Sequence, residues 1–163
     1  MRSAAYTAWI VLLAGLILAG CGFHLRGQSS LPFASAHVEA SPGSAIAPLL
    51  LQSLRLNGKQ VVDSPRAAEV TIRLERELKG KEILSLSGGG KVREFRLSQR
   101  VTLSAYDRGG RVLLAPTELT LTRDTSYDDA QALAKEAEEA QLMRDMEQEM
   151  LRQILRRLAY AKP

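Results

Sequence analysis

The sequence is short of the residues that carry catalysis. It has 163 residues but one cysteine, Cys21, so an intramolecular disulfide is excluded. Its two histidines, His24 and His37, have no metal-ligand partners at a useful spacing, and both are expected to be structural or surface residues. No Gly-x-Ser-x-Gly elbow and no phosphate-cradling glycine loop is present. We therefore expect a binding or scaffolding protein that is not an enzyme, with no metal and no cofactor.

Long apolar runs are also lacking, with one exception at the amino terminus. Residues 8–17 are almost entirely apolar and follow the cationic Arg2. This run is shorter than the roughly 20 residues that a membrane-spanning helix needs, and it has the pattern of a secretion signal. It ends at Leu18-Ala19-Gly20-Cys21, which resembles the lipobox of bacterial lipoproteins. The sequence therefore predicts a signal peptide over residues 1–20, which is removed, and a covalent lipid on Cys21.

The alternative for a lone cysteine is burial in a core as a free thiol. Cys21 ends the hydrophobic run, which favours lipidation over that alternative. A lipobox cysteine typically carries three acyl chains, more than the two signals that stable anchoring needs. Gly22 follows it, where inner-membrane lipoproteins usually have aspartate. We expect a lipid-anchored protein of the outer membrane that faces the periplasm.

The sequence also lacks a strong net charge. The formal net charge is +4, and +3 once Arg2 leaves with the signal. That balance is too mild for a nucleic-acid-binding protein, although cations gathered on one face would suit an anionic partner. Aromatic residues are few, so we expect a mainly aliphatic core. The remaining chain is long enough for one domain. We expect a lipidated amino terminus and tether over residues 21–36 and a single domain over residues 37–163.

The first half of that domain predicts a strand and a helix. Residues 37–40 are a strand candidate. Ser44 is expected to cap a helix that runs to about Leu56, with Gly58 in the left-handed position after it. Residues 70–86 alternate apolar and polar side chains, as a half-buried strand does, and the alternation weakens around Gly80, where we expect a bulge or break.

The second half predicts two more strands and a long helix. Gly88-Gly89-Gly90 is expected to form the turn into a strand that reaches Ala105, and residues 107–110 a hairpin turn into a strand over 111–123. Pro116 favours an edge or a bulge there. Residues 131–158 predict one helix, in which an apolar stripe is expected to pack on the core. The stripe consists of Leu133, Ala137, Ala140, Met143, Met150, Ile154 and Leu158. The element order favours an α+β two-layer sandwich, with two helices on one face of a mainly antiparallel sheet of about four strands.

Three short motifs resemble one family. They are Cys21-Gly22-Phe23-His24-Leu25-Arg26-Gly27, Leu54-Arg55-Leu56-Asn57-Gly58 and Ala132-Leu133-Ala134-Lys135. Their order and spacing resemble those of the LptE family of lipopolysaccharide-assembly lipoproteins. The resemblance implies an outer-membrane subunit of the lipopolysaccharide translocon, partly inside the lumen of the LptD β-barrel. It also implies a role in assembling and plugging that barrel and in binding lipopolysaccharide for insertion into the outer leaflet.

The lipopolysaccharide-binding residues are expected among the cations. The resemblance associates basic residues beside the central hairpin turn and in the Ala-Leu-Ala-Lys motif with lipopolysaccharide. Lys135 matches the motif. Lys91 and Arg93 adjoin the glycine turn and would take the place of the hairpin residue, and Arg96 and Arg100 continue along the polar face of the strand. Any of these can instead be an ordinary solvated charge.

A second function of a different class stays open. The chain can be a structural outer-membrane lipoprotein of another barrel-assembly or envelope-integrity complex that does not bind lipopolysaccharide. The two functions can be distinguished by identifying which barrel cross-links to the hairpin around residues 88–90.

Overall fold

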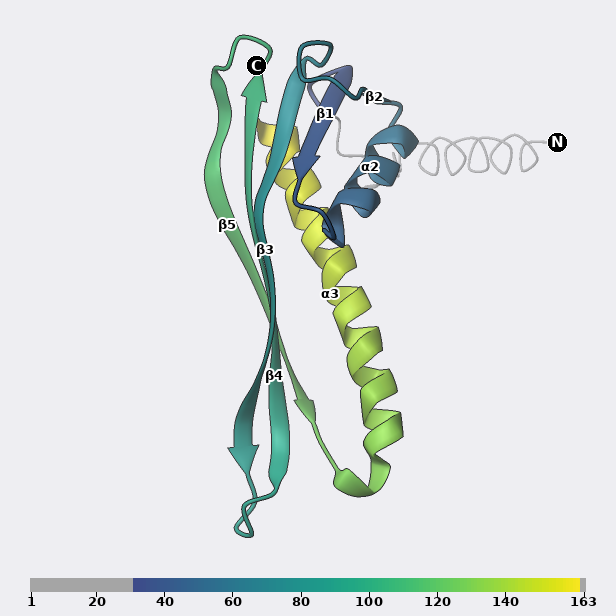
Figure 1. Cartoon of the computed structure of the whole chain (residues 1–163), viewed down its shortest axis with the longest axis vertical. Coiled ribbons are helices and arrows are strands. Elements are labelled where there is room, and N and C mark those ends of the chain that lie inside the picture. Colours follow the sequence, from purple (N-terminus) through teal and green to yellow (C-terminus); the bar gives the residue numbers. More distant parts are fainter. Residues whose placement is uncertain (1–30, 162–163) are drawn as a thin grey trace, which may run out of the picture.

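The computed structural model describes residues 31–161 as one five-stranded sheet with two helices on one face (Figure 1). In chain order the elements are β1 (Ser35–Ala40), α2 (Ile46–Leu56), β2 (Gln60–Val61), β3 (Val70–Leu86), β4 (Val92–Asp107), β5 (Val112–Ser126), the 3-10 turn η1 (Asp129–Gln131) and α3 (Ala132–Tyr160). The strand order is β2-β1-β3-β4-β5, in which β1 runs parallel to β2 and β3, and the other pairs are antiparallel. The α+β class is as predicted, with a fifth, two-residue strand. The expected signal peptide and Cys21 lie outside the described residues.

Local sequence fixes both ends of α2. The Ser44 hydroxyl accepts a hydrogen bond from the Ala47 amide at 3.0 Å, as an N-terminal cap does. At the other end Gly58 has φ +70°, and the amides of Gly58 and Lys59 donate to the carbonyls of Arg55 and Leu54. This pair of bonds is the Schellman motif, which satisfies the last carbonyls of a helix. The helix predicted over residues 44–56 is therefore confirmed, caps included.

The register of β3 is irregular at Glu75 and again between Ile83 and Leu86, but not at Gly80, so the bulge predicted near Gly80 is wrong. Leu74 pairs with Leu103 and Arg76 with Thr102, which leaves Glu75 as the extra residue. A bulge moves the following side chains to the opposite faces. Gly80 instead pairs regularly with Ser98, and a Cβ at position 80 would lie 2.5 Å from the Ser98 hydroxyl. The regular pairing at Gly80 therefore excludes a break there.

Strand β5 forms one edge of the sheet, as Pro116 predicted. Leu103 pairs with Thr117 and Ala105 with Leu114, so two β5 residues, Pro116 among them, lie opposite one β4 residue. Proline lacks an amide donor, and an irregular position on an edge strand removes the need for one. β5 continues three residues past the predicted end at 123, to Ser126.

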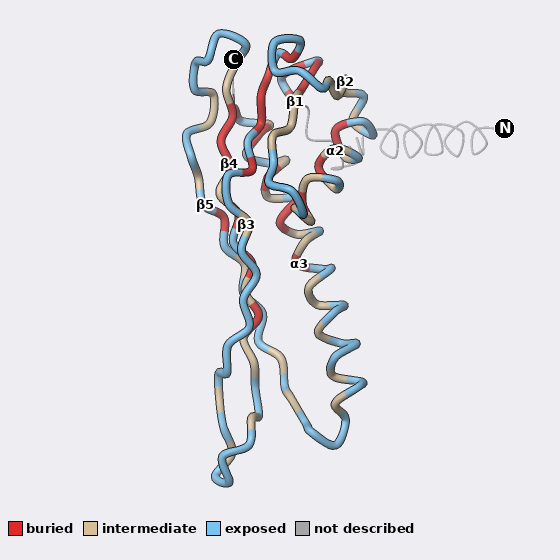
Figure 2. Tube along the Cα trace, viewed as in Figure 1, coloured by how far each residue is buried: buried red, intermediate tan, exposed pale blue. Residues whose placement is uncertain are grey.

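The two halves of α3 differ in burial (Figure 2). Its carboxyl half contributes the buried side chains Met146, Met150, Leu151, Ile154 and Leu158. In the amino half Leu133 is 84% exposed, and Ala137 and Ala140 are exposed too. The expected stripe is therefore wrong for the first half of the helix, because polar bonds to the sheet replace a core there. One of these joins Lys81 of β3 to Glu139 of α3.

The core lies between the helices and the half of the sheet that contains β1. Leu31 and Phe33 belong to it, with exposures of 3% and 6%. Both were expected in the tether, so residues 31–36 are part of the folded domain instead. Lys59 holds this segment by donating to the Leu31 carbonyl at 2.9 Å. Among the described residues, the core side chains that are less than 2% exposed are all aliphatic or methionine.

Candidate functional site

The tip of the β3–β4 hairpin meets the connection from β5 to α3, and we call this region the distal end. The Tyr127 amide donates to the Arg93 carbonyl at 2.7 Å. Lys91 Nζ lies 3.8 Å from Asp129 Oδ2. Figure 1 shows the distal end as the lower tip of the molecule. The fold thereby brings the hairpin cations to the start of the last helix.

Lys135 lies in the first turns of α3 and points back to the sheet. Its ammonium group donates to Ser126 Oγ at 3.0 Å and to Glu138 Oε2 at 2.9 Å. The hydrogen bond from Lys135 holds the pKa of the Glu138 carboxyl below its usual range, and the ammonium charge acts in the same direction. The side chain of Lys135 is only 19% exposed. An anion that binds here must therefore compete with Glu138 for the ammonium group.

Two aromatic rings and a third lysine complete the distal end. Phe95 and Tyr127 pack edge to face with their ring centroids 5.2 Å apart. Lys81 Nζ lies 4.2 Å from the Phe95 centroid and also pairs with Glu139 of α3. A cation over an aromatic face is a favourable arrangement. Sequence analysis missed Lys81 as a site residue, because only the bulge at Glu75 turns its side chain toward the helices.

Arg96 and Arg100 do not join this cluster. They lie on the sheet face that carries no helix in the described chain, which we call the open face. Arg96 binds Asp124 through two hydrogen bonds of 2.8 and 3.0 Å, and Arg100 lies 3.3 Å from Glu118. The hydrogen bonds and charge of Arg96 hold the pKa of Asp124 below its usual range, and Asp124 raises the pKa of Arg96. The five predicted site residues therefore fall into two groups: Lys91, Arg93 and Lys135 at the distal end, and two cross-strand ion pairs.

Arg93 is the distal cation with the fewest polar contacts. It is exposed, and its side chain makes no ion pair within residues 31–161. Arg93 lies at an irregularity near the start of β4, because Glu94 pairs with Ser85 and Val92 pairs with Leu86, which leaves Arg93 as the extra residue. An incoming anion can therefore reach the Arg93 guanidinium without displacing a carboxylate.

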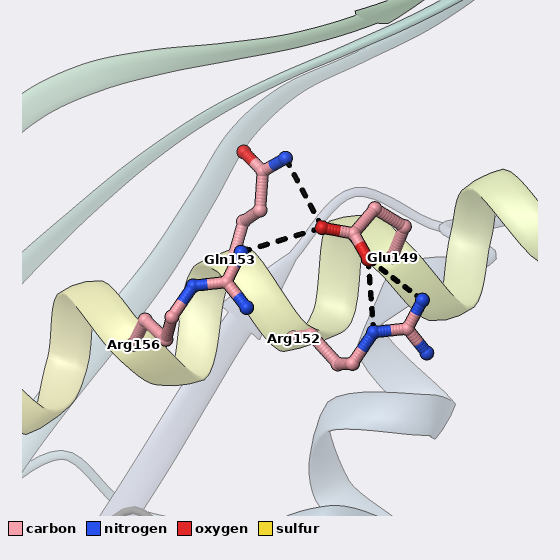
Figure 3. A network of polar contacts seen from close by, with 4 residues as sticks. All are labelled: Glu149, Arg152, Gln153 and Arg156. Carbon is pink, nitrogen blue, oxygen red and sulfur yellow. Dashed lines mark hydrogen bonds and ion pairs between the residues drawn. The ribbon is translucent and has the colours of Figure 1, made fainter.

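A separate polar network covers the surface of α3 near its carboxyl end (Figure 3). Glu149 accepts two hydrogen bonds from Arg152, at 2.7 and 2.9 Å, one from Arg156 at 3.3 Å and one from Gln153 at 3.4 Å. The bonds from Arg152 and then the other donors hold the pKa of Glu149 below its usual range. All four residues lie on one helix at spacings that support it. This network stabilises the helix, and its two arginines are paired with Glu149.

Two further types of site are absent from the described chain. Within residues 31–161 no three histidine, aspartate or glutamate side chains come together as metal ligands would. Neither helix of this part is both long and apolar enough to span a bilayer.

Comparisons with known proteins identify the family. The model of the family described as "LptE: Lipopolysaccharide-assembly" matches residues 32–158. The chain belongs to the LptE family. The LPS-assembly lipoprotein LptE of Photorhabdus laumondii is 29% identical over 149 residues, which cover 90% of this chain and 81% of that protein. The protein of the same name from Yersinia pestis is 31% identical over 150 residues, which cover 90% and 72%.

Two solved structures are similar to this chain in sequence and fold. An uncharacterized lipoprotein B from Nitrosomonas europaea is 39% identical and has a TM-score of 0.72 over 83% of this chain and 88% of that one. The rare lipoprotein B from Shewanella oneidensis is 26% identical, with a TM-score of 0.67 over 77% and 93%. The chain is therefore an LptE family member by sequence and shares its fold with proteins described as lipoprotein B.

Proposed function

We propose that this protein is the lipoprotein subunit of the outer-membrane lipopolysaccharide translocon. In this proposal Cys21 carries the lipid anchor on the periplasmic side, and the domain lies partly inside the LptD barrel, which it helps to assemble and plugs. The distal end binds lipopolysaccharide for insertion into the outer leaflet. LptE family membership supports the general role, and the grouping of cations at the distal end supports the site.

The observation that carries the binding site is the meeting of Lys91 and Arg93 with Lys135. These residues are some 40 positions apart in the chain, yet the bonds from Tyr127 to Arg93 and from Lys91 to Asp129 hold their segments together. Lipid A carries phosphate groups, and cations form strong charge-assisted hydrogen bonds with phosphate. Lys81, above the Phe95 ring, adds a fourth cation on the same side of the sheet.

Exposed apolar side chains beside these cations suit the rest of the ligand. Ile83 and Leu86, near the tip of β3, are 57% and 55% exposed. Large apolar side chains grouped at an exposed tip often mark a binding surface. Acyl chains next to phosphates would meet apolar and cationic groups at the same end of the molecule.

The open face suits the interior of a barrel. Two of its arginines are paired across strands, Arg96 with Asp124 and Arg100 with Glu118. Lumen-facing surfaces of outer-membrane barrels are polar. A polar sheet face whose arginines have such partners suits contact with that surface.

Photocrosslinking in cells tests the partner. A photoreactive residue at Gly89 or at Lys135 should yield adducts with LptD and with lipopolysaccharide. The same probe at Tyr160, which is 83% exposed at the other end of α3, serves as a control for random collision. Adducts with a different barrel, and none with lipopolysaccharide, would support the structural-lipoprotein alternative instead.

Charge reversal tests the ligand site. Lys135→Glu alone, or Lys91→Glu with Arg93→Glu, should weaken lipopolysaccharide binding by the purified protein while the circular dichroism spectrum is unchanged. Arg144→Glu is the matched control for Lys135→Glu, because Arg144 is exposed on the same helix and binds only Gln141 among the described residues. Equal binding by Lys135→Glu and Arg144→Glu would exclude Lys135 from the site.

A further inference from the structure

A cationic hollow lies at the end of the sheet opposite the distal end. It has a volume of about 310 Å³ and is lined in part by Arg66, Arg73, Tyr106 and Arg108. Arg66 lies in the loop before β3, Arg73 in β3, Tyr106 near the end of β4 and Arg108 in the β4–β5 turn. We call this end, which also contains the first described residues, the proximal end. Figure 1 shows it at the top of the molecule.

One of the three arginines is already engaged. Arg73 Nε donates to Glu39 Oε2 at 2.6 Å, and its guanidinium lies 4.9 Å from the Tyr106 ring centroid. Arg108 uses one donor, Nε, on the Ala68 carbonyl at 3.2 Å. Arg66 is exposed and makes no ion pair within residues 31–161. Two guanidinium groups therefore keep donors for an external acceptor.

The carboxylate in the lining of this hollow is neutralised elsewhere. Asp107 accepts hydrogen bonds from the amide of Arg111 at 2.8 Å and from its guanidinium at 3.0 Å. These bonds hold the pKa of Asp107 below its usual range. Asp107 therefore stays charged but is occupied by Arg111, and the hollow keeps a positive surplus.

The proximal end is also where the chain enters the domain. A neighbouring hollow of about 500 Å³ is lined by Pro32, Phe33 and Arg108 among others, so Arg108 lies beside the first described residues. Position 32 follows Cys21 by eleven residues, which span at most about 40 Å when fully extended. The proposed acylation of Cys21 would therefore attach the domain to the membrane through its proximal end, within about 40 Å of the head groups.

We propose that Arg66 and Arg108 form a membrane-contact site for the phosphate groups of anionic phospholipids in the leaflet that holds the anchor. The proposal rests on the proposed acylation of Cys21 and is independent of lipopolysaccharide binding. Guanidinium groups bind phosphate in a bidentate manner, and cations near an anionic bilayer are attracted to its surface. Two contacts, the acyl group and this site, would fix the tilt of the domain as well as its position.

The test uses the full mature lipoprotein, with acylation verified by mass spectrometry, in vesicles. Cys21 is the only cysteine and its thiol is acylated, so a cysteine introduced at Gly109 can carry a single fluorophore. Gly89→Cys provides the matched distal label. Vesicles contain phosphatidylcholine alone or with phosphatidylglycerol, plus a quencher attached to the head groups. We expect stronger quenching at position 109 than at 89, and a further increase at 109 with phosphatidylglycerol.

Charge-neutral variants identify the cations. Arg66→Gln with Arg108→Gln should remove the increase that phosphatidylglycerol produces at position 109. The control pair, Arg144→Gln with Arg123→Gln, makes the same change in net charge at exposed positions of α3 and β5 and should keep the increase. If both pairs lose the phosphatidylglycerol-dependent increase equally, the effect depends only on net charge, and the proposed site is wrong. Equal quenching at 109 and 89, or an unacylated Cys21, would overturn it as well.

Two further arms distinguish a phospholipid site from a free-anion site and from the lipopolysaccharide site. Inorganic phosphate added at matched ionic strength should not abolish the phosphatidylglycerol effect. If phosphate binds and the vesicle effect is absent, the hollow takes a free anion and the lipid assignment is wrong. Arg66→Gln with Arg108→Gln should leave lipopolysaccharide binding and LptD cross-linking unchanged. A negative result for the phospholipid site would therefore not contradict the proposed function. A negative result for lipopolysaccharide binding would likewise not contradict the phospholipid site.

Discussion

The Glu77 carboxylate of β3 is hydrogen-bonded to the Ser44 hydroxyl at the start of α2, at 2.7 Å. Its other oxygen accepts from the Ala45 amide at 3.3 Å. A carboxylate at a helix N-terminus satisfies free amides and interacts favourably with the helix dipole. Glu77→Ala should therefore lower the free energy of unfolding by about 1–2 kcal/mol, measured by urea denaturation. Glu82→Ala, an exposed glutamate on the same strand, is the control and should change it by less than about 0.5 kcal/mol.

Gln99 should be replaceable with a gain in stability. It is fully buried on the helix side of β4, and neither its amide nitrogen nor its oxygen has a hydrogen-bond partner within the described chain. Gln99→Met keeps the length of the side chain and removes the unpaired polar atoms, so the free energy of unfolding should rise by about 1 kcal/mol. Gln99→Ala should lower it, because the cavity outweighs the loss of the amide. A lower stability for Gln99→Met would show that a partner satisfies this amide in solution.

Acid should weaken the pairing of Arg96 with Asp124. The pKa of Asp124 is lowered in the folded protein, so its contribution to stability is complete above the ordinary aspartate pKa and is lost as pH falls through the lowered value. In Arg96→Gln that pKa should return toward the ordinary value. Carboxyl-carbon chemical shifts of Asp124, followed by NMR through acid titration, measure both midpoints. Identical midpoints in the two proteins would mean that the ion pair does not form in solution.

The amino half of α3 should open more readily than its carboxyl half. Lys81 and Glu139 join it to β3, and exposed ion pairs contribute only about 0.2–1 kcal/mol each. Lys81→Glu should therefore raise hydrogen exchange roughly two- to fivefold in residues 132–145 and leave residues 146–160 unchanged. The swapped pair, Lys81→Glu with Glu139→Lys, should restore slow exchange. Faster exchange along the whole helix would indicate that its two halves unfold together.

The sequence predicted the helices and strands better than it predicted the contacts between them. Ser44, Gly58 and Pro116 act through local backbone chemistry, and each prediction based on them is confirmed. The bulge was misplaced because Gly80 was the visible irregularity. The decisive change is the switch of the inward face from Ile72 and Leu74 to Glu77 and Lys79. Charged residues turned toward α3 are invisible to a search for apolar alternation.

The site shows the same division. Lys91, Arg93 and Lys135 were selected by resemblance, and their proximity depends on where β5 ends, which no periodicity gives. Arg96 was placed correctly on the polar face of its strand. Its cross-strand partner Asp124 could not be foreseen without the register between β4 and β5. Lipopolysaccharide binding by these residues remains a prediction.

The length of the β3–β4 hairpin sets a distance. The 17 residues of β3 at about 3.3 Å each span about 56 Å, which exceeds the roughly 40–45 Å thickness of a bilayer with its head groups. In the proposed arrangement, with Cys21 acylated and the domain inside the barrel, a ribbon of this length would bring the Gly88–Gly90 turn level with the opposite surface of the membrane. The hairpin could then contact a lipid at the opposite leaflet while the protein stays anchored in its own leaflet.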